Sequence, residues 1–152
     1  MKNAARLLLL GLVVTSSLSF ANGEFQPFIV GGSVAAEGDF PFIASLQDSS
    51  GHFCGASLIR KNWVLTAAHC MQGSSIKKVM IGLTDQKSAA KAEAIKAKRV
   101  IEHPQYDADS SDFDFALIEL EHDAVTEPIT LNETEIDISS DPKNQIMATV
   151  AG

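Results

Sequence analysis

The stretch Trp63-Val64-Leu65-Thr66-Ala67-Ala68-His69-Cys70 joins a short apolar run to a histidine and a cysteine. The aromatic and aliphatic residues at its start favour a β-strand, which the chain enters through the polar pair Lys61-Asn62. A neutral histidine held beside a short turn can act as a general base near pH 7, because its unperturbed pKa is about 6.5. A lone histidine is also a common structural residue, so the rest of the chain must decide between these two interpretations.

Short apolar runs lie on both sides of this stretch and are separated by polar turns. They are Phe42–Leu46, Phe53–Ile59, Val79–Leu83, Ile95–Ile101 and Phe113–Leu120. Strands at this spacing predict an all-β barrel or sandwich. The Ala89–Ala97 stretch looks helical, but it is short and lacks a cap. A further strand-like run begins at Met147–Val150.

Composition and charge exclude several classes of protein. The chain has 152 residues, of which 45% are hydrophobic and 20% are charged, and these are ordinary values for a globular domain. They argue against a disordered tail or a fibre, and the length allows one domain or two small ones. The net charge is −7, and the only basic cluster is Lys96, Lys98 and Arg99, so we expect no nucleic-acid partner.

The first residues are typical of a secretory signal peptide. Lys2 and Arg6 precede the apolar run Leu7–Leu18, which is shorter than the roughly 20 residues of a membrane-spanning helix. Ser19-Phe20-Ala21 then supplies small residues at the two positions that a signal peptidase requires. We therefore predict a signal peptide over residues 1–21, with an uncleaved membrane anchor as the alternative. The mature protein is expected to be exported, secreted or periplasmic, without a membrane partner after cleavage.

An oxidising compartment changes the interpretation of the two cysteines. Cys54 and Cys70 are the only cysteines, so a single intramolecular bridge is possible, with two free thiols as the alternative. A zinc site or a thiol catalyst would need more ligands or a reducing compartment. We expect the bridge, and a loop of this size gives about 3 kcal/mol of stability in the chain-entropy treatment.

A second motif supplies a carboxylate. Asp112-Phe113-Asp114-Phe115-Ala116-Leu117-Ile118 places Asp114 between aromatic residues at the start of an apolar run. We expect this carboxylate to be at least partly buried and therefore to need a partner. An imidazole N–H is a suitable partner, since the pair fixes the tautomer and stabilises the imidazolium. The alternative is a strand-end or capping aspartate.

Five motifs follow one another along the chain. They are Ile29-Val30-Gly31-Gly32, Cys54-Gly55-Ala56-Ser57-Leu58-Ile59, Trp63–Cys70, His103-Pro104-Gln105-Tyr106 and Asp114-Phe115-Ala116-Leu117-Ile118. In this order they resemble the trypsin/chymotrypsin-like serine proteases. The resemblance covers Ile29–Gly152, and five motifs in sequence are far more specific than any one of them.

The resemblance implies an all-β fold, a two-barrel protease of which residues 29–152 form the N-terminal part. That part is the first six-stranded antiparallel Greek-key barrel, truncated at Val150-Ala151-Gly152, which looks like the start of the second barrel. The resemblance also implies that His69 is the general base and Asp114 its orienting carboxylate, as in the triad known from this family. Cys54 and Cys70 would form the bridge that holds the histidine turn.

The family's nucleophile is a serine in a Gly-Asp-Ser-Gly-Gly setting, which this sequence does not contain. Asp48-Ser49-Ser50-Gly51 precedes the histidine motif and is predicted to be a turn, and Ser57 lies inside a strand motif. The oxyanion-hole amides and the specificity pocket also belong to the family's second barrel. We therefore expect the chain to need that barrel, and to be inactive alone towards protein or peptide substrates.

Family members are activated by a cut before the isoleucine of the first motif, here between Phe28 and Ile29. Asn22–Phe28 would then be a short propeptide, and the absence of Arg or Lys before the cut favours an activator that accepts Phe. No cofactor or metal is expected. The loop Asp85–Ala97, where some members hold calcium, has only two acidic side chains, whereas calcium takes six to eight oxygen ligands.

Three functions fit these observations. The first is a secreted serine endopeptidase of which this chain carries the histidine and the aspartate. The second is a catalytically inactive protease-like module that binds or regulates and keeps His69 and Asp114 by inheritance. The third is a separate hydrolase that uses these two residues with water or a metal. Retention of both residues favours the first, and the nucleotide sequence beyond the codon for Gly152 would discriminate between them.

Overall fold

A computed structural model gives the fold and describes residues 32–73, 75–87, 89–136 and 148–151. These residues fall into a short segment that ends at Val34 and a compact unit that begins at Ala35, and the fold below is that of the second unit. The predicted signal peptide (residues 1–21), the predicted propeptide (residues 22–28) and the predicted cut between Phe28 and Ile29 lie outside the described residues.

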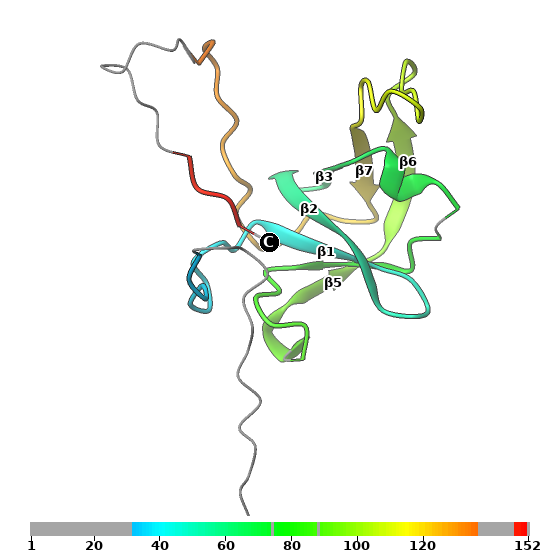
Figure 1. The fold of residues 1–152 in the computed structure, drawn as a ribbon. Coiled ribbons are helices and arrows are strands. Elements are labelled where there is room, and N and C mark those ends of the chain that lie inside the picture. Colours follow the sequence, from blue (N-terminus) through cyan, green and yellow to red (C-terminus); the bar gives the residue numbers. More distant parts are fainter. Residues whose placement is uncertain (1–31, 74, 88, 137–147, 152) are drawn as a thin grey trace, which may run out of the picture. The chain divides into compact units, whose positions relative to one another are not determined.

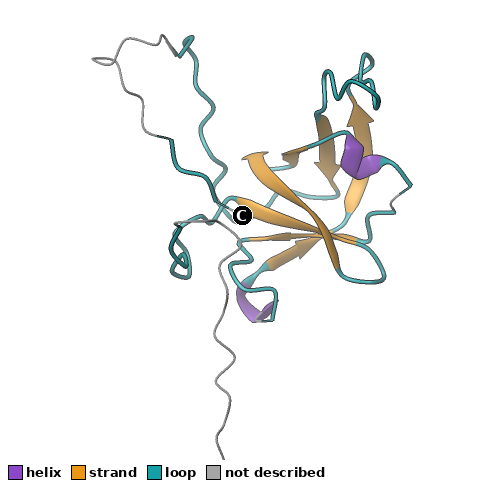
Figure 2. Ribbon diagram, viewed as in Figure 1, coloured by secondary structure: helices purple, strands orange, loops and turns teal. Residues whose placement is uncertain are grey.

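Seven antiparallel strands form one curled sheet, and the predicted all-β class is confirmed (Figures 1 and 2). The strands are β1 (Ile43–Gln47), β2 (His52–Arg60), β3 (Trp63–Thr66), β4 (Lys78–Ile81), β5 (Glu93–Ile95), β6 (Ala97–Glu102) and β7 (Ala116–Leu120). Two single 3₁₀ turns, η1 (His69–Met71) and η2 (Ala89–Lys91), are the helical elements among the described residues. In that part of the chain, no helix has the length and hydrophobicity of a membrane span.

The strand order explains how the sheet curls into a barrel. The order is β5-β4-β1-β2-β3-β7-β6, and the run β4-β1-β2-β3 is the spatial order of a Greek key. β5 and β6 lie at the two ends of this order, yet Lys96 alone separates them in the chain. The expected strand Ile95–Ile101 covers only the last residue of β5 and most of β6, and it bends at Lys96, where the pairing changes from β4 to β7. The six predicted runs therefore appear as seven strands.

Three predicted segments differ from the structure by more than two residues or in type. The run expected from Phe113 begins as a strand only at Ala116, because Phe113 has a positive φ of 53° that interrupts an extended backbone. The Ala89–Ala97 stretch is a 3₁₀ turn followed by β5. Residues 148–150 of the last strand-like run are not in a strand, and Met147 lies outside the described residues.

The barrel interior is filled by aliphatic side chains from almost every strand. The largest fully buried ones are Leu46, Leu58, Ile81, Ile95, Ile118, Leu120, Val64 and Val79. Alternate residues of a strand point to opposite faces, so Ile118 and Leu120 of β7 both enter this interior. The core thus holds β3 and β7 side by side, and these two strands lead to the predicted site residues.

Shortening one core side chain tests this packing. Ile118 is fully buried, so Ile118→Val should lower the free energy of unfolding by about 1 kcal/mol, through the lost methylene and the small cavity that it leaves. Urea unfolding followed by fluorescence measures the change. Val125 is 85% exposed, and the control Val125→Ala should stay within about 0.5 kcal/mol of the wild type. Equal effects of the two substitutions would contradict this description of the core.

Candidate active site

His69 follows β3, a strand that is paired on both sides. β3 is paired with β2 on one side and with β7 on the other, and Val64 within it is fully buried. Ala68 is also fully buried, whereas the side chain of His69 is 61% exposed. The backbone that carries the imidazole is therefore fixed by the core, while the ring itself faces outward at η1.

The predicted disulfide between Cys54 and Cys70 is present, with 6.2 Å between the two Cα atoms. It joins β2 to η1, immediately after His69. A hydroxyl adds a second link, because Thr66 Oγ1 donates to the carbonyl of Gly55 at 2.8 Å. β2 is thus tied to the turn that bears His69 by a covalent bond, and to the end of β3 just before this turn by a hydrogen bond.

Asp114 reaches the same place from β7. Thr66 at the end of β3 pairs with Ala116 at the start of β7, so the residues just beyond these two ends are neighbours. The N–H of Phe115 donates to the carbonyl of Phe113 at 2.8 Å, which turns the backbone tightly around Asp114. The side chain of Asp114 is 25% exposed, in agreement with a partly buried carboxylate.

The two side chains meet through both oxygens of the carboxylate. His69 Nδ1 lies 2.7 Å from Asp114 Oδ2, and the backbone N–H of His69 donates to Oδ1 at 2.8 Å. An ionised carboxylate only accepts, so Nδ1 carries the proton and the lone pair of the neutral ring is on Nε2. Nε2 lies 3.6 Å from Sγ of Cys70, which carries no hydrogen in the disulfide and leaves that lone pair free to accept a proton.

The hydrogen bond from the His69 ring, followed by the one from its backbone N–H, holds the pKa of Asp114 below its usual value. Because this pKa is lower in the folded than in the unfolded chain, the ionised carboxylate stabilises the fold above the unfolded value of about 3.9. That contribution is lost as the pH falls through the lower folded value.

The contribution of Asp114 to the free energy of unfolding should therefore depend on pH in the acid range. The free energy of unfolding should fall less steeply between about pH 5 and pH 2 in Asp114→Asn than in the wild type, because the variant has no carboxylate to protonate there. Urea unfolding across this pH range measures the slope. The exposed Asp123 supplies the control Asp123→Asn. An unchanged slope in Asp114→Asn would contradict the inferred pKa shift.

The serines that the sequence analysis rejected as nucleophiles lie in a turn and in a strand. Asp48 Oδ1 accepts the N–H groups of Ser50 and Gly51 at 2.6 and 3.1 Å, so the β1–β2 connection is the expected turn. Ser57 is a residue of β2 and pairs with Leu65. Both cysteine sulfurs near His69 are joined to each other and are not free to bind a metal.

A sequence model of the trypsin family matches residues 29–152. The chain belongs to the trypsin family. The protein "Trypsin Blo t 3" of Blomia tropicalis is 45% identical over 94 residues, which make up 62% of this chain and 35% of that protein. The solved VesB protease of Vibrio cholerae is similar with a TM-score of 0.62 and 32% identity, over 66% of this chain and 33% of that one.

This member of the trypsin family spans about a third of the length of these two relatives. The predicted family and barrel fold are confirmed, and the family is one of serine proteases. The structure brings His69 and Asp114 together, with Cys54 and Cys70 beside them. Phe28 and Ile29 are outside the described residues.

Two groups that support the strands and the turn of the site were not predicted. The first is His103, whose ring packs against Phe113 and Phe115 on either side of Asp114 in the sequence. The motif that begins at His103 carried part of the family resemblance, but neither its spacing nor its composition indicates a contact with these rings.

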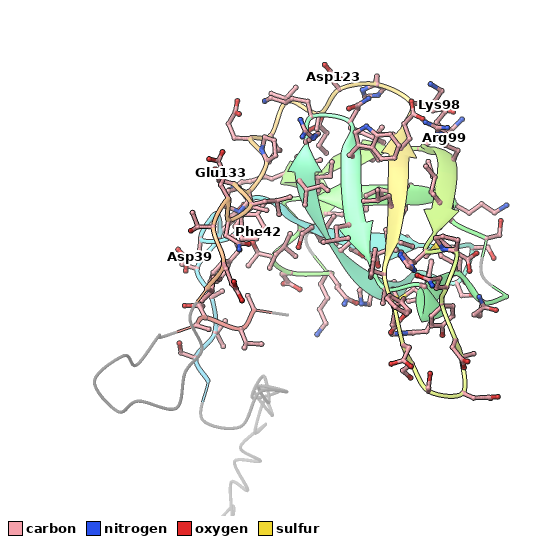
Figure 3. The ribbon with its side chains drawn as sticks, turned by 90° about the horizontal axis from the view of Figure 1, so that it is seen from above. Asp39, Phe42, Lys98, Arg99, Asp123 and Glu133 are labelled. Carbon is pink, nitrogen blue, oxygen red and sulfur yellow. A yellow bond between two sulfur atoms is a disulfide. The ribbon has the colours of Figure 1, made fainter. Side chains whose placement is uncertain are left out.

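The second group ties β3, β7 and β6 together on the barrel. Glu119 is only 9% exposed, and hydrogen bonds from Lys98 and then Arg99 keep its pKa below the usual value. Arg99 also lies over the ring of Trp63, 5.5 Å from the centroid. Figure 3 shows the side chains of Lys98 and Arg99 close together. This group supports the strand pairing that leads to Asp114, and only its two basic residues, as part of the cluster Lys96, Lys98 and Arg99, were noted in the sequence.

Proposed function

We propose that this chain is the histidine- and aspartate-bearing part of a secreted serine-type endopeptidase that hydrolyses peptide bonds in proteins or peptides. The observation that carries the proposal is the two-point contact between His69 and Asp114, at 2.7 Å from Nδ1 and 2.8 Å from the backbone N–H. Membership of the trypsin family supports it. The nucleophilic serine, the oxyanion hole and the substrate pocket would come from a segment outside the 152 residues.

The proposal gives each side chain a role in this reaction. Nε2 of His69 takes the proton of the serine hydroxyl as the oxygen attacks the substrate carbonyl, and later returns a proton to the leaving amine. Asp114 holds the ring in the tautomer with the Nδ1 proton and stabilises the positive charge that forms on the imidazole. The disulfide and the buried Ala68 keep the ring in place, which reduces the reorganisation required in each step.

The 152-residue chain alone should have no measurable peptidase activity, because a histidine–aspartate pair without a serine cannot form the acyl-enzyme. In this family, the activity that remains when a triad member is lost comes from the oxyanion hole and substrate binding. The measurement is hydrolysis of a fluorogenic peptide by purified protein, with labelling by a fluorophosphonate probe as a second readout. Turnover that depends on His69 in the chain alone would contradict the proposal and favour a separate hydrolase.

The nucleotide sequence beyond the codon for Gly152 separates the protease from the inactive module. A Gly-Asp-Ser-Gly-Gly motif downstream, followed by peptidase activity and serine labelling of the longer product, would support the proposal. A stop codon directly after that for Gly152, with a stable, secreted product, would instead support a binding or regulatory module.

Secretion and activation are further parts of the proposal. The sequence features of residues 1–21 support export, and the position of Ile29 supports a cut after Phe28. N-terminal sequencing of the exported protein tests both. A first residue of Ile29 is expected, whereas Asn22 would contradict removal of the propeptide and Met1 would contradict signal cleavage.

A further inference from the structure

The ring of His103 contacts both sequence neighbours of Asp114. It lies 4.8 Å from the ring of Phe113, centroid to centroid, with only 15° between the planes. The ring of Phe115 is 4.5 Å away at an angle of 48°. Phe113 and Phe115 are 49% and 44% exposed, so each ring is covered only in part, and His103 provides an aromatic contact for both.

Phe113 needs such a partner because of its backbone. Its φ of 53° lies in the left-handed region, which a bulky side chain adopts only when its surroundings hold it there. The same backbone bends through the hydrogen bond from Phe115 N–H to the Phe113 carbonyl, at 2.8 Å. Asp114 sits at the centre of this turn, so the turn determines where its carboxylate points.

His103 itself is held by hydrogen bonds of its backbone and of its ring. Its N–H donates to the carbonyl of Phe115 at 3.1 Å, and its carbonyl accepts the N–H of Tyr106 at 3.0 Å. The ring nitrogen Nδ1 accepts the N–H of Gln105 at 3.3 Å. The ring is therefore a fixed surface against which the two phenylalanines can pack.

We propose that His103 is a positioning residue, whose ring packs against Phe113 and Phe115 and keeps Asp114 in the turn that directs its carboxylate to His69. The hydrogen bonds and ring contacts of His103 in the described part of the chain go to Gln105, Tyr106, Phe113 and Phe115, so we place its effect on His69 through Asp114. Its significance for catalysis rests on the proposed function, but its effect on the contact between His69 and Asp114 belongs to this chain alone.

The experiment measures that contact directly in the 152-residue chain. The proton on His69 Nδ1, hydrogen-bonded to a carboxylate, gives a separate downfield resonance in the proton NMR spectrum, assigned by its loss in His69→Gln. We would compare His103→Ala, His103→Gln and His103→Phe with the wild type. The glutamine variant keeps an acceptor for the N–H of Gln105 but has no ring, whereas the phenylalanine variant keeps a ring and has no acceptor. His122→Ala, which changes an exposed histidine, is the control.

The expected result is loss of the downfield resonance in His103→Ala and His103→Gln, and its retention in His103→Phe and His122→Ala. Retention in both ring-less variants would overturn the proposal, as would retention in His103→Gln with loss in His103→Phe, because the acceptor and not the ring would then matter. Failure of both ring-less variants to fold would also overturn it, in favour of a general structural role.

This experiment separates the inference from the proposed function. The resonance needs no serine, so the positioning role can hold in a chain that proves to be an inactive module. Conversely, peptidase activity of a longer product, with the resonance unaffected by His103, would support the proposed function and reject this inference. In such a product, the ring-less variants should lower kcat more than they change KM, because the proposed role acts through the contact between Asp114 and His69.

Discussion

Asp114→Asn is expected to lower the kcat of the proposed complete protease, in which this chain would be joined to the serine-bearing part, by about 10⁴-fold, as the corresponding change does in the family's well-characterised triad. Here Oδ2 receives the Nδ1 proton at 2.7 Å and Oδ1 receives the backbone N–H at 2.8 Å. An asparagine would keep its oxygen on the backbone N–H and present its NH₂ group to Nδ1. The ring would then carry its proton on Nε2, where it cannot accept one from serine.

Steady-state kinetics with a peptide substrate measures this loss, with enzyme concentration fixed by the folded fraction of each sample. Asp112→Asn is the matched control, because Asp112 lies two residues earlier and its carboxylate accepts the hydroxyl of Ser110 at 2.9 Å. The control should stay close to the wild type. A loss of less than about tenfold in Asp114→Asn would show that the tautomer argument does not apply to this pair.

Removing the disulfide is expected to have the largest effect on stability. Cys54 and Cys70 are separated by 16 positions, and the loop-closure entropy of such a bridge corresponds to about 3 kcal/mol in the free energy of unfolding. For a chain of this length the double variant Cys54→Ala/Cys70→Ala should therefore melt about 10 °C lower. Differential scanning calorimetry measures the shift.

Reduction provides the control for this experiment. A reductant should lower the melting temperature of the wild type by a similar amount and leave the double variant unchanged, since only the wild type has a bond to lose. If the double variant melted at the wild-type temperature, the bridge would contribute nothing to the stability of the turn that carries His69.

The sequence was sufficient for the strands whose apolar runs end in clear turns. β1, β2 and β3 lie within about one residue of their predicted bounds, because the polar turns Asp48–Gly51 and Lys61-Asn62 separate them. The bend at Lys96 was not predicted, since Ala94-Ile95-Lys96-Ala97 contains neither Gly nor Pro. That bend results from pairing with two different strands, which is a property of the whole barrel and not of local residues.

For the candidate site, the sequence indicated the residues but not how they are held. The family resemblance named His69, Asp114 and the two cysteines. The left-handed backbone of Phe113 could not be predicted, because residues of this size seldom adopt it. Its side chain packs against His103, which is distant in the sequence, and that contact is visible only in the structure. The hydrogen bonds that hold the chain after β7 were also not predicted. There, Glu93 accepts the N–H of Val125 at 3.0 Å, and Lys61 donates to the carbonyls of Val125 and Thr126.

The bend at Lys96 also has a consequence for the behaviour of the protein in concentrated solution. Open sheets present long rows of unused N–H and C=O groups, and these rows can recruit strands from other molecules into aggregates. In this barrel the outermost segments are the three residues of β5 and the six residues of β6. β6 carries Lys98 and Arg99, and lysine on an edge strand disfavours addition of another chain. The kink that gives one strand two partners thus also limits edge-to-edge self-association.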